Sequence, residues 1–78
     1  MNNKLLLPHE QHVLLRSLYN AGMNNSFLIS ASEFETAREL RQLGLIEIFT
    51  VMVDLTSAVG QRSLLAMRIS SRGMEVAS

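Results

Sequence analysis

Two histidines three residues apart, His9 and His12, are the side chains of this sequence best suited to bind a metal ion. At this spacing both imidazoles can lie on one side of a helix. A zinc site needs a third ligand and usually a fourth, but Glu10 points to another side of the helix, and the chain has no other histidine and no cysteine. We therefore expect two exposed histidines near the start of a helix, and neither a metal nor a cofactor.

The side chains of this sequence do not indicate nucleophilic catalysis. There is no cysteine thiolate, and the serines show no Ser–His–Asp spacing relative to Asp54, the only aspartate. No glycine-rich loop follows a strand in the way that a phosphate-binding loop does. Because neither an activated nucleophile nor a paired acid and base is visible, we expect a binding protein and not an enzyme.

The composition indicates one small domain, residues 1–78, without long-range attraction for nucleic acid. Seven basic residues balance seven acidic ones, so any contact with phosphates must come from a local patch. The apolar run near the N-terminus is too short for a signal peptide, and no run in the sequence approaches the length of a membrane span. We expect a cytoplasmic protein without a membrane partner.

Apolar spacing and turn-forming residues predict two helices in the first half of the chain. The first covers residues 8–21 and ends at Gly22, and a short strand follows at residues 26–30. The second begins at Ser32, which has the spacing of a capping box with Glu35. The expected buried faces consist of Val13, Leu14, Leu18 and Ala21 in the first helix, and of Phe34, Ala37, Leu40 and Leu43 in the second.

The stretch ELRQLGLIEI, residues 39–48, predicts a helix that stops at a glycine and turns directly into a strand. Gly44 suits the left-handed conformation that often follows a helix. Leu45 can then fold back on Leu40 in a Schellman arrangement, which gives the chain a defined exit direction.

The second half of the chain predicts a β-hairpin and a short final helix. Residues 45–53 and 63–69 are rich in apolar and β-branched side chains, and turn-formers separate them. Ser70 is placed to cap a helix that runs through residues 74–76. The predicted order is therefore α-β-α-β-β-α, in a single α+β domain.

This order, together with three local patterns, resembles the winged helix-turn-helix superfamily. LLRSLYNAG (residues 14–22) is similar to the family's first helix, ELRQLGLIEI to the end of its recognition helix, and ISSRGMEVA (residues 69–77) to the segment that closes the wing. The resemblance implies a winged-helix-like domain with a two-stranded wing that binds DNA. The short distance between Gly22 and Gly44 implies that the family's positioning helix is reduced to a turn near residues 31–34 or is missing.

The resemblance places DNA contacts on the second helix and on the wing. The side chains that suit base edges or phosphates there are Thr36, Arg38, Arg41, Gln42, Arg62 and Arg68. Glu33, Glu35 and Glu39 give the same helix a net acidic surface, so an alternative is a solvated helix face with local ion pairs.

Both predicted hairpin strands are apolar on both of their faces, whereas a wing with one solvent face should show polar residues there. One face packs on the helices, and the other needs a cover. The N-terminal KLLL, residues 4–7, could supply a third strand, but we expect a homodimer because so small a chain has little core of its own.

Two functions follow from these observations. The first is a small DNA-binding transcription regulator of bacterial or phage type. The second is a winged-helix-like module for protein–protein interaction that does not bind DNA, such as a phage-encoded inhibitor or adaptor of host machinery. Family resemblance favours the first, whereas the balanced charge and the missing positioning helix favour the second.

Overall fold

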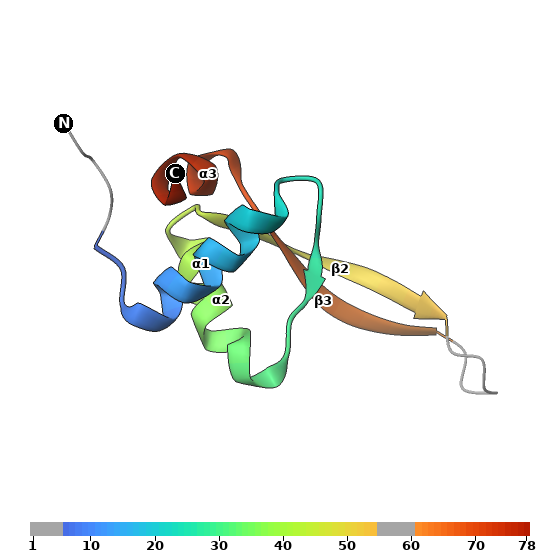
Figure 1. Ribbon diagram of the computed structural model, residues 1–78. Helices are drawn as coiled ribbons and strands as arrows, with labels where there is room; N and C mark the ends of the chain where they lie inside the picture. Colours follow the sequence, from blue (N-terminus) through green and yellow to red (C-terminus); the bar gives the residue numbers. More distant parts are fainter. Residues whose placement is uncertain (1–5, 55–60) are drawn as a thin grey trace.

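The computed structural model describes residues 6–54 and 61–78, which form three helices, one 3-10 turn and three strands. The expected α+β class and the order of helices and strands are confirmed (Figure 1). The elements are α1 (His9–Ala21), β1 (Phe27–Leu28), η1 (Ala31–Glu33), α2 (Phe34–Gln42), β2 (Ile46–Asp54), β3 (Gln61–Ile69) and α3 (Ser71–Ala77).

The strands form one antiparallel sheet in the order β1-β3-β2. Strands β2 and β3 are the predicted hairpin, in continuous register from Ile46 opposite Ile69 to Asp54 opposite Gln61. The third strand is β1 and is not formed by the N-terminal leucines. Leu6 is 99% exposed and Leu7 lies outside any strand, while Lys4 and Leu5 lie outside the described residues.

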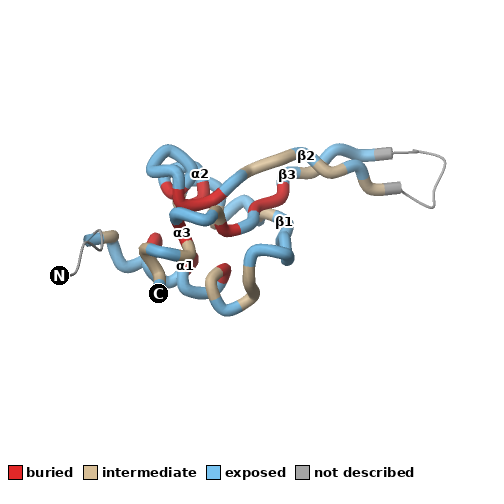
Figure 2. Tube along the Cα trace, turned by 90° about the horizontal axis from the view of Figure 1, so that it is seen from above, coloured by how far each residue is buried: buried red, intermediate tan, exposed pale blue. Residues whose placement is uncertain are grey.

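The helices pack against one face of the sheet, at the end where the hairpin begins. Figure 2 shows the buried residues gathered there, whereas the outer half of the hairpin extends away from the helices. The buried cluster consists of Leu14, Leu15, Leu18, Ala37, Leu40, Leu45, Ile46, Met67 and Ile69. The core therefore supports only the base of the hairpin.

The expected buried face of α1 is partly wrong. Val13 is 48% exposed, and the buried residues are Gln11, Leu14, Leu15 and Leu18. These four follow the i, i+3, i+4, i+7 spacing of a helix face. The polar Gln11 occupies one position of that face, so a search for apolar residues alone selected a neighbouring stripe.

The expected buried face of α2 is too wide. Only Ala37 and Leu40 are buried, while Phe34 is 39% and Leu43 is 42% exposed. A helix of nine residues makes a short contact with the rest of the core. The residues at its two ends therefore lie beyond that contact.

The predicted capping box between Ser32 and Glu35 is wrong. The chain first makes the 3-10 turn η1, and α2 begins only at Phe34. Ser30 and Glu33, a pair with the same spacing two residues earlier, take this role. The Ser30 N–H donates to Glu33 Oε1 at 3.3 Å, and the Ser30 hydroxyl donates to the same oxygen at 3.0 Å. Glu35 instead forms an ion pair with Arg38 on the same helix.

The corner after α2 has the predicted Schellman geometry. Gly44 has φ of 77°, and its N–H donates to the Arg41 carbonyl at 2.9 Å. The Leu45 N–H donates to the Leu40 carbonyl at 3.0 Å, and both leucines are fully buried. The end of α2 therefore fixes the direction in which β2 leaves.

The last helix is attached to the same corner. The Ser70 hydroxyl accepts from the Gly73 N–H at 3.0 Å, as predicted for a cap, and also donates to the Gly44 carbonyl at 2.7 Å. The Ser70 N–H donates to the Leu45 carbonyl at 3.0 Å. Through these bonds, α3 holds the two strands of the hairpin together at their base.

Within the described residues, no helix combines the length and the apolar character needed to cross a membrane.

Gly44→Val should destabilise the protein by on the order of 1–2 kcal/mol or more, because a β-branched residue adopts positive φ only with strain. The expected loss of stability does not come from a steric clash, since a Cβ at this position would make only an ordinary contact with Arg72. Gly44→Asn is the matched control and should cost less, because asparagine tolerates the left-handed region. Equal melting temperatures for both variants and the wild type would disprove the assignment.

Gly73→Ala should also destabilise the protein, but for a steric reason. An added Cβ would overlap the Leu45 carbonyl oxygen and press on Ile69, both of which are parts of the hairpin base. Overpacking of this kind costs about 1–3 kcal/mol. Chemical denaturation measures the change, and Ser71→Ala at an exposed position of the same helix is the control. A stability equal to that of the control would show that α3 does not pack this closely.

Candidate interaction surfaces

Helix α2 exposes three of the four residues assigned to it as DNA contacts. At 100° per residue, Arg38, Arg41 and Gln42 fall within about 100° of one another, and all three are exposed. Gln42 lies opposite the buried face, whereas Arg41 lies at its margin, next to Ala37. Thr36 lies elsewhere, because it is half-buried and lines a hollow between α1 and α2. The helix thus brings together two arginines and one glutamine.

Arg38 is engaged with a carboxylate of its own helix. Its Nη2 donates to Glu35 Oε1 at 2.8 Å, and both side chains are largely exposed. This hydrogen bond, together with the charge of Glu35, raises the pKa of the Arg38 guanidinium above its ordinary value. An exposed pair of this kind contributes little to stability, so Arg38 can exchange Glu35 for another anion at low cost.

A second carboxylate of α2 is held by α1. Gln11 Nε2 donates to Glu39 Oε1 at 2.6 Å, across the interface between the two helices. Gln11 is buried, and this bond satisfies its amide in an otherwise apolar contact. The bond fixes the rotation of α2 relative to α1, and hence the direction in which the exposed arginines point.

On the hairpin, Arg68 is held close to the base. Its Nε donates to Glu47 Oε1 at 2.9 Å on the neighbouring strand, and its guanidinium lies 5.3 Å from the centre of the Phe49 ring. Arg62 lies near the far end of the hairpin, opposite Val53, and is exposed. The two arginines therefore lie on the same face of the sheet but at opposite ends of the hairpin.

The face of the hairpin that carries these arginines is not covered by the helices. Alternation along the strands places one set of residues toward the core, starting at Ile46 and Ile69, and the other set on the opposite side. We call this opposite side the open face. Its apolar residues are Leu28, Phe49, Val51, Val53, Leu64 and Ala66, and none belongs to the core cluster.

The open face is a continuous apolar strip. Leu28 on β1 is 55% exposed, and Phe49, Val51, Val53 and Leu64 are each partly exposed. Glu47 and Arg68 close the strip at the base of the hairpin. The predicted second apolar face is thus present, and it lies on the side of the sheet opposite the core cluster. Ala66, in its middle, is buried among its neighbours.

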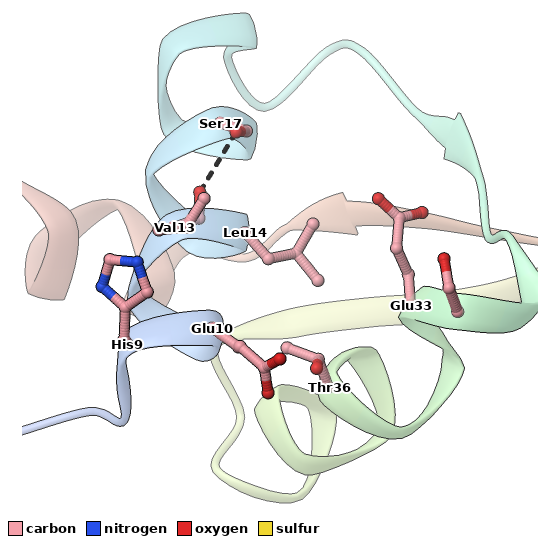
Figure 3. A pocket seen from close by; sticks show the side chains of 8 residues that line it. His9, Glu10, Val13, Leu14, Ser17, Glu33 and Thr36 are labelled. Atoms are coloured by element: carbon pink, nitrogen blue, oxygen red, sulfur yellow. Dashed lines mark hydrogen bonds between the residues drawn. The ribbon is translucent and has the colours of Figure 1, made fainter.

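A hollow of about 310 Å³ lies between α1 and the η1–α2 segment. In Figure 3, Leu14 points into it, with Glu10, Glu33 and Thr36 around it and His9 at its margin. Its polar groups are partly engaged locally, since the Ser17 hydroxyl donates to the Val13 carbonyl and Glu33 bonds Ser30. The two carboxylates give the hollow an acidic rim, which disfavours phosphate.

His9 and His12, the two histidines weighed as metal ligands, are both exposed on the first turn of α1. Among the described residues, no group of three or more possible ligands gathers around His9 and His12 or elsewhere.

Three features of these surfaces were not predicted from the sequence. The Gln11–Glu39 bond joins residues that are 28 positions apart, and no local pattern signals it. The short strand β1 was predicted, but its pairing with β3 was missed, because a strand of two residues carries no signal of its partner. The contact of Arg68 with Glu47 and Phe49 could have been found, because the register of the predicted hairpin places these residues on one face.

Gln11→Ala should destabilise the protein by about 1–2 kcal/mol, because it removes a partly buried hydrogen bond to a charged group. Glu39→Ala should cost a similar amount, and the double variant should cost less than the sum of the two. His12→Ala, at the exposed neighbouring position, is the control and should be nearly neutral. Strict additivity in denaturation experiments would show that Gln11 and Glu39 do not interact.

Comparisons of the chain with protein-family models, with curated proteins and with solved structures found no significant match.

Proposed function

We propose that the protein is a small winged-helix-like, duplex-DNA-binding protein that serves as a transcription regulator of bacterial or phage type. The observation that carries the proposal is the placement of arginines on two projecting elements of one body. Helix α2 exposes Arg38 and Arg41, and the hairpin carries Arg62 near its far end. Such a helix suits the major groove, and such a hairpin suits the adjacent backbone.

Each exposed polar residue has a distinct role in this proposal. Arg38, Arg41 and Gln42 approach base edges, where arginine pairs with guanine and glutamine with adenine. Arg62 neutralises a phosphate, and Arg68 stays at the base of the hairpin with Glu47. Thr36 has no role, because it faces the hollow beside α1.

The structural support for this function includes the connection between its two elements. The Schellman corner at Gly44 and the bonds of Ser70 join α2 rigidly to the hairpin. A single turn, η1, precedes α2 where the resemblance expected a reduced positioning helix. Bracing of α2 then comes from α1, through Gln11 and Glu39.

The charges of the chain set the strength of this binding. Glu35 and Glu39 lie on α2 next to the arginines, and the chain has no net charge, so long-range attraction to DNA is absent. Because few phosphates are neutralised, duplex binding should be weak at physiological salt and measurable at low salt. Fluorescence anisotropy of a labelled duplex at low ionic strength tests the function, and a lack of binding there would refute it.

Arg62→Ala should weaken duplex binding similarly for all sequences and should lower the slope of log K against log salt by about one, because one phosphate contact is lost. Arg41→Ala should instead reduce the preference between sequences, by about 1–3 kcal/mol if it contacts a guanine. Arg16→Ala removes an equal charge from α1, where Arg16 donates to the Ala77 carbonyl, and should leave binding unchanged. Equal losses for all three variants would contradict the assigned roles.

Glu35→Gln should strengthen duplex binding at low salt, because it releases Arg38 and removes a negative charge from α2. Glu75→Gln on α3 removes the same charge at a distance from α2 and is the matched control. If both substitutions strengthen binding equally, only net charge matters and α2 is not the contact element.

A protein–protein interaction module without DNA binding is the second candidate, and the uncovered open face favours it. A contiguous apolar strip on a small protein is typical of a contact site for another protein. A phage-encoded inhibitor or adaptor of host machinery would use such a surface. This candidate takes first place if the duplex does not bind at low salt.

A further inference from the structure

The outer edge of the sheet is formed by β2, a long strand with one unpaired side. The strand order β1-β3-β2 places β3 in the centre, and Figure 2 shows α2 on the β2 side, near the base of the hairpin. The outer part of β2 continues beyond the helices toward the end of the hairpin (Figure 1). This free edge is a template for another β-strand.

The register shows which backbone groups of β2 point outward. The Ile29 N–H donates to the Leu65 carbonyl at 3.0 Å, so the backbone groups of Leu65 face β1. Leu65 lies opposite Thr50, and in an antiparallel ladder such a pair exchanges no hydrogen bonds. The N–H and carbonyl of Thr50 therefore point away from β3, as do those of Ile48 and Met52, two positions away on either side.

The usual protections of an edge strand are missing from this segment. Residues 46–54 contain no lysine, proline or glycine, and the pairing with β3 runs without a bulge. The only charged residues are Glu47 and Asp54, close to the two ends. The middle of the edge is thus open and apolar.

We propose that a second copy of this chain pairs with the free edge, β2 against β2 in antiparallel orientation, with a two-fold axis at Thr50. This pairing is self-complementary. On the helix-facing side, Ile48 lies beside Met52 of the partner subunit, and on the open face, Phe49 lies beside Val51 of the partner subunit. At the axis, two threonines meet, which is a favourable cross-strand pair.

Charge supports the same arrangement. In this register Glu47 lies opposite Val53 of the partner subunit, and Arg62 of the partner subunit is the next residue in the same row, because Val53 and Arg62 are paired in the hairpin. Two strand spacings separate Glu47 from this arginine, about 10 Å between backbones, a distance that two long side chains can bridge. Each copy thus places an arginine near an acid of the other.

The pairing joins the two sheets into one and makes their open faces continuous. It also provides hydrogen-bond partners for the outward groups of Ile48, Thr50 and Met52 in both copies. A strand from another protein could form the same backbone hydrogen bonds. Only a second copy of β2, however, places apolar residues beside apolar residues, threonine beside threonine and an acid near an arginine around the axis at Thr50. The proposal does not depend on DNA binding.

Thr50→Lys should convert the dimer to a monomer in light scattering at micromolar to millimolar concentration, because two lysines would meet at the axis. Ser63→Lys adds the same charge to β3, on the same side of the sheet but away from the β2 edge, and should leave the dimer intact. Circular dichroism melts establish that all variants fold. A wild-type protein that is monomeric at every concentration would overturn the proposal.

Leu28→Lys separates edge pairing from stacking of two open faces. Leu28 is exposed on the open face but lies on β1, at the opposite side of the sheet from the β2 edge. The edge dimer should survive this substitution, and a stacked dimer should not. Loss of the dimer in Leu28→Lys with retention in Thr50→Lys would overturn the edge pairing.

The absence of cysteine allows a direct test of the register. Thr50→Cys should form an intermolecular disulfide efficiently under mild oxidation, because directly opposite residues have the Cα separation that a disulfide requires. Ser63→Cys is the control and should cross-link many-fold less. Equal cross-linking of the two variants would refute the two-fold axis at Thr50.

Discussion

The left-handed turn at Gly44 is the constraint on which the rest of the molecule depends. It ends α2, folds Leu45 onto Leu40, and leaves the Gly44 carbonyl to accept from Ser70. Because Ser70 also caps α3, one corner joins the second helix, both hairpin strands and the last helix. A chain without disulfides thereby orients a long hairpin using a few backbone bonds.

The same corner explains why so much apolar surface stays uncovered. It directs the hairpin away from the helices, so the small core reaches only the base of β2 and β3. Nine residue pairs extend the hairpin, although only its first pairs contact the buried cluster. The outer part of the hairpin therefore carries more apolar side chains than the core can bury, and the proposed dimer gives this surplus a partner.

The fold was predictable from the sequence where local rules decide the outcome. Gly44, Ser70 and the hairpin followed from capping and strand patterns, because those signals lie within a few neighbouring residues. The start of α2 was misjudged, because Ser30–Glu33 and Ser32–Glu35 offer the same spacing and only the tertiary structure chooses between them. The face of α1 was misjudged, because Gln11 is buried through a bond to the distant Glu39.

The candidate site was predictable only as a set of residue types. The sequence indicates which arginines a winged helix would use, but not that Arg38 bonds Glu35, that Arg68 bonds Glu47, or that Thr36 turns toward α1. These outcomes depend on side-chain directions and on the relative rotation of packed helices. Neither is encoded in spacing along the chain.

Arg62 connects the proposed DNA contact with the proposed dimer, since each assigns it an anionic partner. In the dimer it approaches Glu47 of the partner subunit, and in the DNA complex it approaches a phosphate. These roles are compatible, because the dimer depends mainly on backbone bonds and apolar contacts of the β2 edge, whereas an exposed ion pair contributes little. Arg62 can therefore leave Glu47 without separating the subunits, while Arg68 remains beside Glu47 to balance its charge. The proposed pairing uses the backbone edge of β2, whereas the proposed base contacts lie on α2, so the two proposals assign different elements to the two partners and share only this one arginine.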